Sequence, residues 1–251
     1  METIDKSMYT PMMRQFLTIK EDYNDAIVFF RLGDFYEMFF TDAYIASREL
    51  EIQLTARDAG AKERVPMCGV PHHASEAYIE RLINKGFKVA VVEQVEDPST
   101  AKGIVKRDVV RLITPGTYMD IKNDDISYIA SVGLNINNYT VSYLDISTGE
   151  SYSILLPKDQ DVLISELNQI EPKEIIISSY FDQSFLENYT KNNGILVSFN
   201  TDTETPSFMN HLFNTLPSKE EKKTYKRLLN YIIRLHFHNK FYHKIEYKPI
   251  S

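Results

Sequence analysis

The spacing of apolar residues changes along the chain between helical and strand periods, and these periods predict its elements. Over residues 11–23, apolar side chains recur at helical spacing. Thr10 and Pro11 suit the cap and the first position of this helix. Residues 26–30 form a continuous apolar run that predicts a buried strand, and the three- and four-residue spacing over 35–50 predicts a second amphipathic helix. Further helices are expected at 76–85, 161–169, 183–191, 207–215 and 220–236, and further strands at 52–55, 87–93, 105–113, 128–134, 140–144, 151–156, 174–178 and 195–199.

A polar segment at residues 119–127 divides the chain into two predicted domains. It carries three aspartates and no apolar period, so we expect a linker there between a domain at 1–118 and a domain at 128–238, followed by a tail at 239–251. Both domains mix helices with strands, which predicts an α/β (α+β) protein with mixed sheets. Just before the linker, residues 114–117 (TPGT) place Pro and Gly in the central positions of a type II turn.

Composition and charge exclude several classes of protein. The 251 residues include one cysteine, Cys68, so an internal disulfide is impossible, and no apolar run approaches the roughly 18 residues of a membrane-spanning helix. The N-terminus has no apolar segment typical of a signal peptide, so we expect a cytoplasmic protein. The 35 acidic and 28 basic residues give a net charge of −7, which argues against a chain that coats nucleic acid nonspecifically. Any contact with DNA must therefore depend on local features.

The segment 33–40 (GDFYEMFF) carries the most informative chemistry. Phe35 and Glu37 lie at the start of the expected second helix, where both side chains can point past the helix end. One interpretation is an ordinary helix start with core aromatics. The other is an exposed aromatic wedge that unstacks a base while the neighbouring carboxylate hydrogen-bonds it.

At this segment the chain resembles the MutS family of DNA mismatch-repair proteins. The N-terminal domain of that family carries a Phe-x-Glu motif in the same Gly-Asp-Phe-Tyr-Glu context, which stands here at residues 33–37. The resemblance extends over almost the whole chain. Its other segments are TPMM at 10–13, FFRLG at 29–33, PMCGVP at 66–71, residues 93–98 and 102–103, VVRLITPGT at 109–117 and LDISTGE at 144–150.

The resemblance implies roles for the two domains and for particular residues. Residues 1–118 would form the mismatch-recognition domain, residues 128–238 a ribonuclease-H-like connector domain, and the tail at 239–251 would lead toward the core domain of the family. Phe35 would stack on a mispaired or unpaired base from the minor groove, and Glu37 would hydrogen-bond that base. Insertion costs least at a mismatch, where the duplex is already weakened.

Basic residues are the candidates for contacts to the DNA backbone. Arg57 and Arg107 occupy positions where the family has DNA-contacting arginines, and Lys106 and Arg111 lie near Arg107, with Lys102 upstream. The alternative is a solvated strand face. If 106–111 is a regular strand, Arg107 and Arg111 share one face and Lys106 points to the other.

The resemblance also implies partners and cofactors beyond this chain. The family's ATPase, with ATP and Mg²⁺, would lie in another region, because the sequence contains no Gly-x-x-x-x-Gly-Lys-Ser/Thr motif and no Gly-Lys pair. We therefore expect a binding module rather than an enzyme, with no cofactor or metal of its own. Its expected partners are mismatched double-stranded DNA, MutL through the connector, and a second copy in the full-length protein, in a bacterial cytoplasm close to the nucleoid.

Two other functions remain open. In the first, the chain mainly docks a protein partner, and its DNA contacts are incidental. In the second, it is a metal-dependent nuclease of the ribonuclease H type, in which Asp145 is the first metal-binding carboxylate and Glu174 the one further candidate on the later strands. Two groups of histidines offer weak metal sites. In the first group the histidines are adjacent, and adjacent residues point to opposite sides of an extended chain; in the second group, at 236–243, no cysteine or acid lies near. These histidines are His72 with His73, and His236 with His238 and His243.

Overall fold

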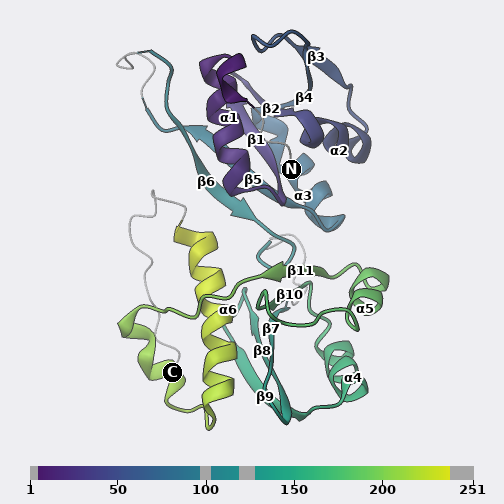
Figure 1. Ribbon diagram of the computed structural model, residues 1–251, viewed down its shortest axis with the longest axis vertical. Coiled ribbons are helices and arrows are strands. Elements are labelled where there is room, and N and C mark those ends of the chain that lie inside the picture. The colour runs from purple at the N-terminus through teal and green to yellow at the C-terminus, as the bar shows by residue number, and fades with distance from the viewer. Residues whose placement is uncertain (1–4, 97–102, 119–127, 238–251) are drawn as a thin grey trace. The chain divides into compact units, whose positions relative to one another are not determined.

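The computed structural model describes residues 5–96, 103–118 and 128–237, and the chain forms two compact units. Unit 1 consists mainly of residues up to 113, and unit 2 mainly of residues 114–234. Each unit has its own sheet with helices packed on it (Figure 1). No helix among the described residues has both the length and the apolar character needed to cross a bilayer. The expected linker at 119–127 and the tail at 239–251 lie outside the described residues.

Unit 1 contains a six-stranded mixed sheet in the order β3-β4-β2-β1-β5-β6. β1 and β5 run parallel, and the other neighbouring strands are antiparallel. The strands are β1 (Ala26–Leu32), β2 (Phe35–Phe39), β3 (Thr55–Arg57), β4 (Val65–Pro71), β5 (Lys88–Gln94) and β6 (Arg107–Ile113).

Helices cover both faces of this sheet (Figure 1). α1 (Pro11–Asp22) lies on one face, where its Phe16 ring packs edge-on against Phe30 and Phe39 at centroid distances of 5.7 and 5.1 Å. α2 (Phe40–Leu50) and α3 (Ser75–Asn84) lie on the other face, and the thiol of Cys68 contacts the carbonyl of Ala43 there at 3.5 Å. Two short 3-10 helices, η1 (Lys6–Met8) and η2 (His72–Ala74), complete the unit.

The expected helix at 35–50 is only partly correct. Residues Phe35–Phe39 form strand β2, and α2 begins at Phe40. Because Gly33 adopts φ 58°, a two-residue turn folds β2 back onto β1 and pairs Phe35 with Leu32. The apolar residues of 35–40 fit a strand as well as a helix, so their spacing could not separate the two.

Four other elements differ from the expectations. The expected strand at 52–55 is displaced to β3, and the sequence reading missed β4 altogether. The expected helix at 207–215 is the 3-10 helix η3 (Ser207–Phe213), and the expected helix at 183–191 is the shorter α5 (Glu187–Asn192). β4 was missed because prolines and a glycine interrupt its apolar residues, and only pairing with β2 and β3 makes it a strand.

Unit 2 contains a five-stranded mixed sheet in the order β11-β10-β7-β8-β9. β7, β8 and β9 form an antiparallel meander, and β10 runs parallel to both β7 and β11. The strands are β7 (Tyr128–Leu134), β8 (Asn138–Asp145), β9 (Ser151–Pro157), β10 (Glu174–Ile177) and β11 (Leu196–Phe199).

The two faces of this second sheet differ in character. α4 (Gln160–Ile170) buries Leu163 and Leu167 on an apolar face that includes Val141 and Ile175. α6 (Lys219–Phe237) packs on the other face through polar contacts, such as the 2.6 Å hydrogen bond between the hydroxyls of Thr140 and Thr224 (Figure 1).

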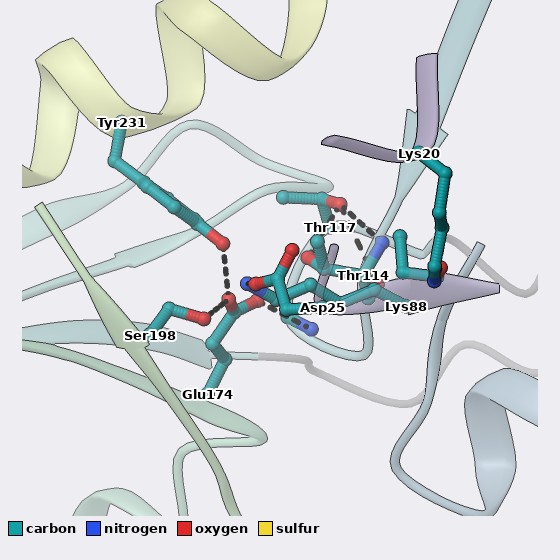
Figure 2. Close-up of polar contacts among 10 residues, drawn as sticks. Lys20, Asp25, Lys88, Thr114, Thr117, Glu174, Ser198 and Tyr231 are labelled. Atoms are coloured by element: carbon teal, nitrogen blue, oxygen red, sulfur yellow. Dashed lines mark hydrogen bonds and ion pairs between the residues drawn. The ribbon is translucent and has the colours of Figure 1, made fainter. Parts of the chain in front are cut away.

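A buried carboxylate, Glu174, joins several segments of unit 2. Its side chain accepts hydrogen bonds from the hydroxyls of Ser198 (2.5 Å) and Tyr231 (2.6 Å), as Figure 2 shows, and from the backbone N–H of Gly116 (3.3 Å). Glu174 has no exposed surface. The three donors therefore compensate for the cost of removing this carboxylate from water.

The turn at 114–117 is not type II. A type II turn requires a positive φ at its third residue, and Gly116 is not among the residues of positive φ. The carbonyl of Thr114 accepts hydrogen bonds from the backbone N–H groups of both Thr117 and Tyr118. Gly116 is needed for space: an added Cβ would lie 2.7 Å from the Cβ of Glu174.

Candidate nucleic-acid interface

Phe35 lies outside the core of unit 1. It is the first residue of β2, directly after the Gly33-Asp34 turn, and 48% of its surface is exposed. Its neighbours on the adjoining strands are Leu32 and Pro71. An aromatic ring exposed at the end of a hairpin can contact a flat apolar surface such as an unstacked base.

Glu37 lies beside Phe35 on the same face of β2, because residues two apart in a strand point the same way. Its side chain lies over Gly69, where an added Cβ would be 3.5 Å from the Cγ of Glu37. Its Oε2 atom forms an ion pair with Nη1 of Arg57, which β3 supplies. The sequence predicted Glu37 and Arg57 as separate candidates, and the structure brings them together.

Arg107 lies on this same face at the other edge of the sheet, with four strands between it and Arg57. The guanidinium carbon of Arg107 is 5.3 Å from the ring centroid of Phe30. The same group donates hydrogen bonds to the carbonyls of Arg31 (2.9 Å) and Val105 (3.0 Å). Burial lowers the pKa of Arg107 from its ordinary value. Because Arg107 has only carbonyl partners among the described residues, its positive charge remains unneutralised.

Arg111 lies on the opposite face, so the expectation that Arg107 and Arg111 share one face of the sheet is wrong. The register of β5 and β6 shifts between Val91 and Val92, so Val91 pairs with Arg111 and Val92 with Val109. The extra residue in β6 reverses the alternation of side chains. Nη1 of Arg111 instead binds the Glu76 carboxylate on α3 at 2.7 Å.

Lys106 precedes β6 and is exposed. It lines a shallow groove of about 470 Å³ together with Arg107 and with Arg14 of α1. The expectation that Lys106 points away from Arg107 assumed a regular strand over 106–111, and it does not apply because β6 begins at Arg107. Lys102 lies outside the described residues.

A polar network on the opposite face of β2 fixes the backbone that carries Phe35. The hydroxyl of Tyr36 donates to the Glu93 carboxylate, and Arg31 binds the same carboxylate at 3.5 Å. Burial, followed by the bond to Glu93, raises the pKa of Tyr36, so this hydroxyl stays a donor. The sequence reading missed this support, although the Tyr36 position between Phe35 and Glu37 indicates an inward side chain once β2 is known to be a strand.

The histidines show no metal site in the described part of the chain. No group of three or more His, Cys, Asp or Glu residues gathers there. His72 and His73 are exposed, and the ring of His72 lies 5.5 Å from the ring of Tyr36. The side chains of His236, His238 and His243 lie outside the described residues.

The two carboxylates of the nuclease alternative lie on opposite faces of the sheet of unit 2. Tyr128 pairs with Asp145, whereas the next residue, Ile129, pairs with Leu144 and Glu174. Adjacent residues in a strand point to opposite faces, so Asp145 and Glu174 cannot converge on one metal ion. Asp145 instead accepts hydrogen bonds from its own turn, including one of 2.7 Å from the hydroxyl of Ser147.

Comparison with known proteins finds the same family over both units. The family model for MutS domain I matches residues 10–122, and the model for MutS domain II matches residues 127–236. These are the mismatch-recognition and connector domains of that family.

Relatives named DNA mismatch repair protein MutS align with most of the chain. The protein of Geobacillus sp. strain WCH70 is 50% identical over 230 residues, which are 90% of this chain and 27% of the relative. The protein of Bacillus subtilis strain 168 is 48% identical over 229 residues, again 90% of this chain, and 26% of the relative. The chain thus spans about a quarter of the length of these relatives. With both family models matched in order along the sequence, the chain belongs to the MutS family and comprises its domains I and II.

Proposed function

We propose that this chain takes part in DNA mismatch repair by recognising mispaired or unpaired bases in duplex DNA through unit 1. The observation that carries the proposal is the position of Phe35, which is about half exposed at the end of a hairpin and beside a carboxylate. Relatives that align with 90% of the chain are named for mismatch repair. Phe35 acts as the wedge that enters from the minor groove, and the unstacking that it requires costs least where pairing is already defective.

Glu37 is the proposed hydrogen-bonding group for the base. Arg57 binds its Oε2 atom, and among the described residues Oε1 has no donor. The ion pair holds the carboxylate beside Phe35 while one oxygen remains available. Arg57 and Arg107 lie on the same face of the sheet as Glu37, and Lys106 lines the groove beside Arg107. These three basic side chains would contact phosphates.

The first test is the loss of mismatch preference in Phe35→Ala. Wild-type protein should bind a duplex with one unpaired base more tightly than the matched duplex, and the ratio should fall to about 1 in the variant, because the wedge is absent. Fluorescence anisotropy measures both affinities. The fluorescence of 2-aminopurine next to the unpaired base reports unstacking directly, at protein concentrations high enough to saturate weak binding.

Tyr44→Ala is the matched control, since Tyr44 is another aromatic of unit 1 that is 55% exposed, on α2. This variant should keep both the preference and the 2-aminopurine signal. Equal mismatch selectivity in Phe35→Ala and wild type would refute the wedge.

A second function, partner docking by unit 2, is favoured by the edge strand β9. Among the described strands it pairs with β8 alone, and Tyr152 and Leu155 on it are each 46% exposed. We propose MutL as the partner, as the family resemblance implies. Retention of MutL on immobilised chain, compared with retention by Leu155→Asp in the same salt, tests this role separately from DNA binding.

A further inference from the structure

A cavity of about 500 Å³ lies in unit 2, where three parallel strands end. Its lining includes Leu134 at the end of β7, Ser178 directly after β10 and Thr201 shortly after β11. β10 runs parallel to both β7 and β11, so the carboxyl ends of these strands meet at one edge of the sheet. In open α/β sheets this edge is the usual place for a ligand.

Basic side chains of α6 dominate the charge of the cavity. Lys219, Lys223 and Arg227 follow one another at four-residue steps, which places them along one side of the helix, and all three line the cavity. The single acid in its lining is Glu220, and within the described residues no ion pair joins a carboxylate to any of the three cations. The cavity therefore has a local excess of positive charge in a chain whose net charge is −7.

Arg227 provides independent evidence for an anion-binding site. Only 4% of its surface is exposed, and its Nη1 atom donates to the carbonyl of Val132 at 3.0 Å. Its Nε atom is buried and has no hydrogen-bond partner in the described structure. Glu220 lies seven residues away, about 10.5 Å along the helix axis, which is too far for a direct contact between the two. A buried guanidinium without an anionic partner is costly, and a bound oxyanion removes that cost.

Side chains rather than the end of α6 would hold this anion. Ser218 and Glu221 form a capping box, in which the backbone N–H of Glu221 donates to the Ser218 hydroxyl at 3.1 Å and the backbone N–H of Ser218 donates to the Glu221 carboxylate at 3.2 Å. The side-chain amide nitrogen of Asn135, which also lines the cavity, adds a neutral donor. Together with Lys219, Lys223 and Arg227, this set of donors matches a group with several negatively charged oxygens.

We infer that this cavity binds a phosphate group, either as inorganic phosphate or as the phosphate of a nucleoside monophosphate. Tyr180 also lines the cavity and is 88% exposed, so its ring is available to stack on a nucleobase in the second case. The site lies wholly within unit 2 and does not depend on the proposed role of Phe35.

Titration of the 251-residue chain with inorganic phosphate, at ionic strength held constant with chloride, tests the site by two-dimensional NMR. We expect saturable shifts in the amide signals of Asn135 and of residues 219–227. Lys223→Gln should weaken binding about tenfold, the usual effect of losing one charge-assisted hydrogen bond. Lys222→Gln makes the same charge change on a neighbouring residue outside the lining and should bind within about twofold of wild type.

Arg227→Lys keeps the charge but removes the planar group of donors, so we expect weaker binding here as well. If that variant fails to fold, which circular dichroism would show, the comparison of Lys223→Gln with Lys222→Gln still decides. A response that does not saturate, or equal weakening in those two lysine variants, would overturn the site. Adenosine monophosphate distinguishes the two sources: tighter binding with a shift at Tyr180 supports a nucleotide, and binding equal to that of phosphate supports recognition of the phosphate group alone.

Discussion

Phe35 and Glu37 acquire their chemical meaning from their neighbours on adjoining strands. Sequence spacing identified both residues and predicted that they point together, but it attributed this to the end of a helix. In the structure they share a face because they are two apart in β2. The ion pair with Arg57 could not be predicted from the sequence, because it depends on a strand, β4, that only pairing reveals.

Gly116 shows how one residue can be identified correctly for the wrong reason. The sequence assigned it to a turn that needs a positive φ, whereas the structure requires a residue without a side chain. An added Cβ would lie 2.8 Å from Oε2 of Glu174, as well as against its Cβ. Glu174 cannot retreat, because β10 lies between β7 and β11 in the sheet.

Gly116→Ala should therefore destabilise unit 2 by about 1–3 kcal/mol, as expected for overpacking in a well-packed interior. Urea unfolding followed by circular dichroism measures the change. A double-mutant cycle with Glu174→Gly provides the control, since this substitution removes both the Cβ and the Oε2 atoms that the added methyl would meet, and Gly116→Ala should then cost much less. The same cost in both backgrounds would show that the contact with Glu174 is not the cause.

At the scale of elements, pairing decides where side chains of a strand point. The period of apolar residues in β6 predicted a regular strand, and a regular strand would place Arg107 and Arg111 together. One register shift against β5 separates them, so Arg107 lies over Phe30 while Arg111 binds Glu76. Bulges leave little trace in a single sequence, because they depend on how two strands match.

The turn between β8 and β9 gives a prediction about acid. Burial raises the pKa of Asp145, but hydrogen bonds from Ser147 and Thr148 outweigh it and hold the pKa below its ordinary value. A carboxyl whose pKa is lower in the folded state stabilises the fold above its unfolded pKa of about 3.9, and that stabilisation is lost as the pH falls through the folded pKa. Asp145 should therefore stabilise unit 2 at neutral pH, and this stabilisation should begin to fall below about pH 4 and disappear once the pH is below the folded pKa.

Asp145→Asn should cost about 1–3 kcal/mol at pH 7 and flatten the fall in stability below about pH 4. Urea unfolding at a series of pH values checks both effects. Asp182 is a graded comparison: hydrogen bonds from Ser184 lower the pKa of its carboxyl too, but the group is exposed and solvent weakens these bonds, so Asp182→Asn should change the profile less than Asp145→Asn. An unchanged acid limb in Asp145→Asn would contradict the assignment.

For the whole molecule, affinity for DNA should be weak and depend strongly on salt. The chain is acidic, and the proposed phosphate contacts are few: Arg57, Arg107 and Lys106. Three phosphate contacts would give a slope of about −2.7 for the logarithm of the binding constant against the logarithm of the salt concentration.

Lys106→Gln should lower this slope by about 0.9 in magnitude, because one phosphate contact is lost. Arg111→Gln removes the same charge from the opposite face and should leave the slope unchanged, since Arg111 binds Glu76 there. Anisotropy titrations between 50 and 200 mM salt, roughly the range in which counterion release is measured, test the pair. Equal effects of the two substitutions would contradict the assignment of the binding face.

Apolar spacing, composition and motif context were sufficient to predict the family, the α/β class and most helices and strands, because these features depend on neighbours along the chain. They also identified Phe35, Glu37, Arg57 and Arg107 as candidates. Tertiary pairing alone made Phe35 part of a hairpin, joined Glu37 to Arg57, moved Arg111 to the far face and placed Asp145 and Glu174 on opposite faces. The physical reason is that side-chain direction in a sheet follows from register between strands distant in sequence, which local periodicity does not encode.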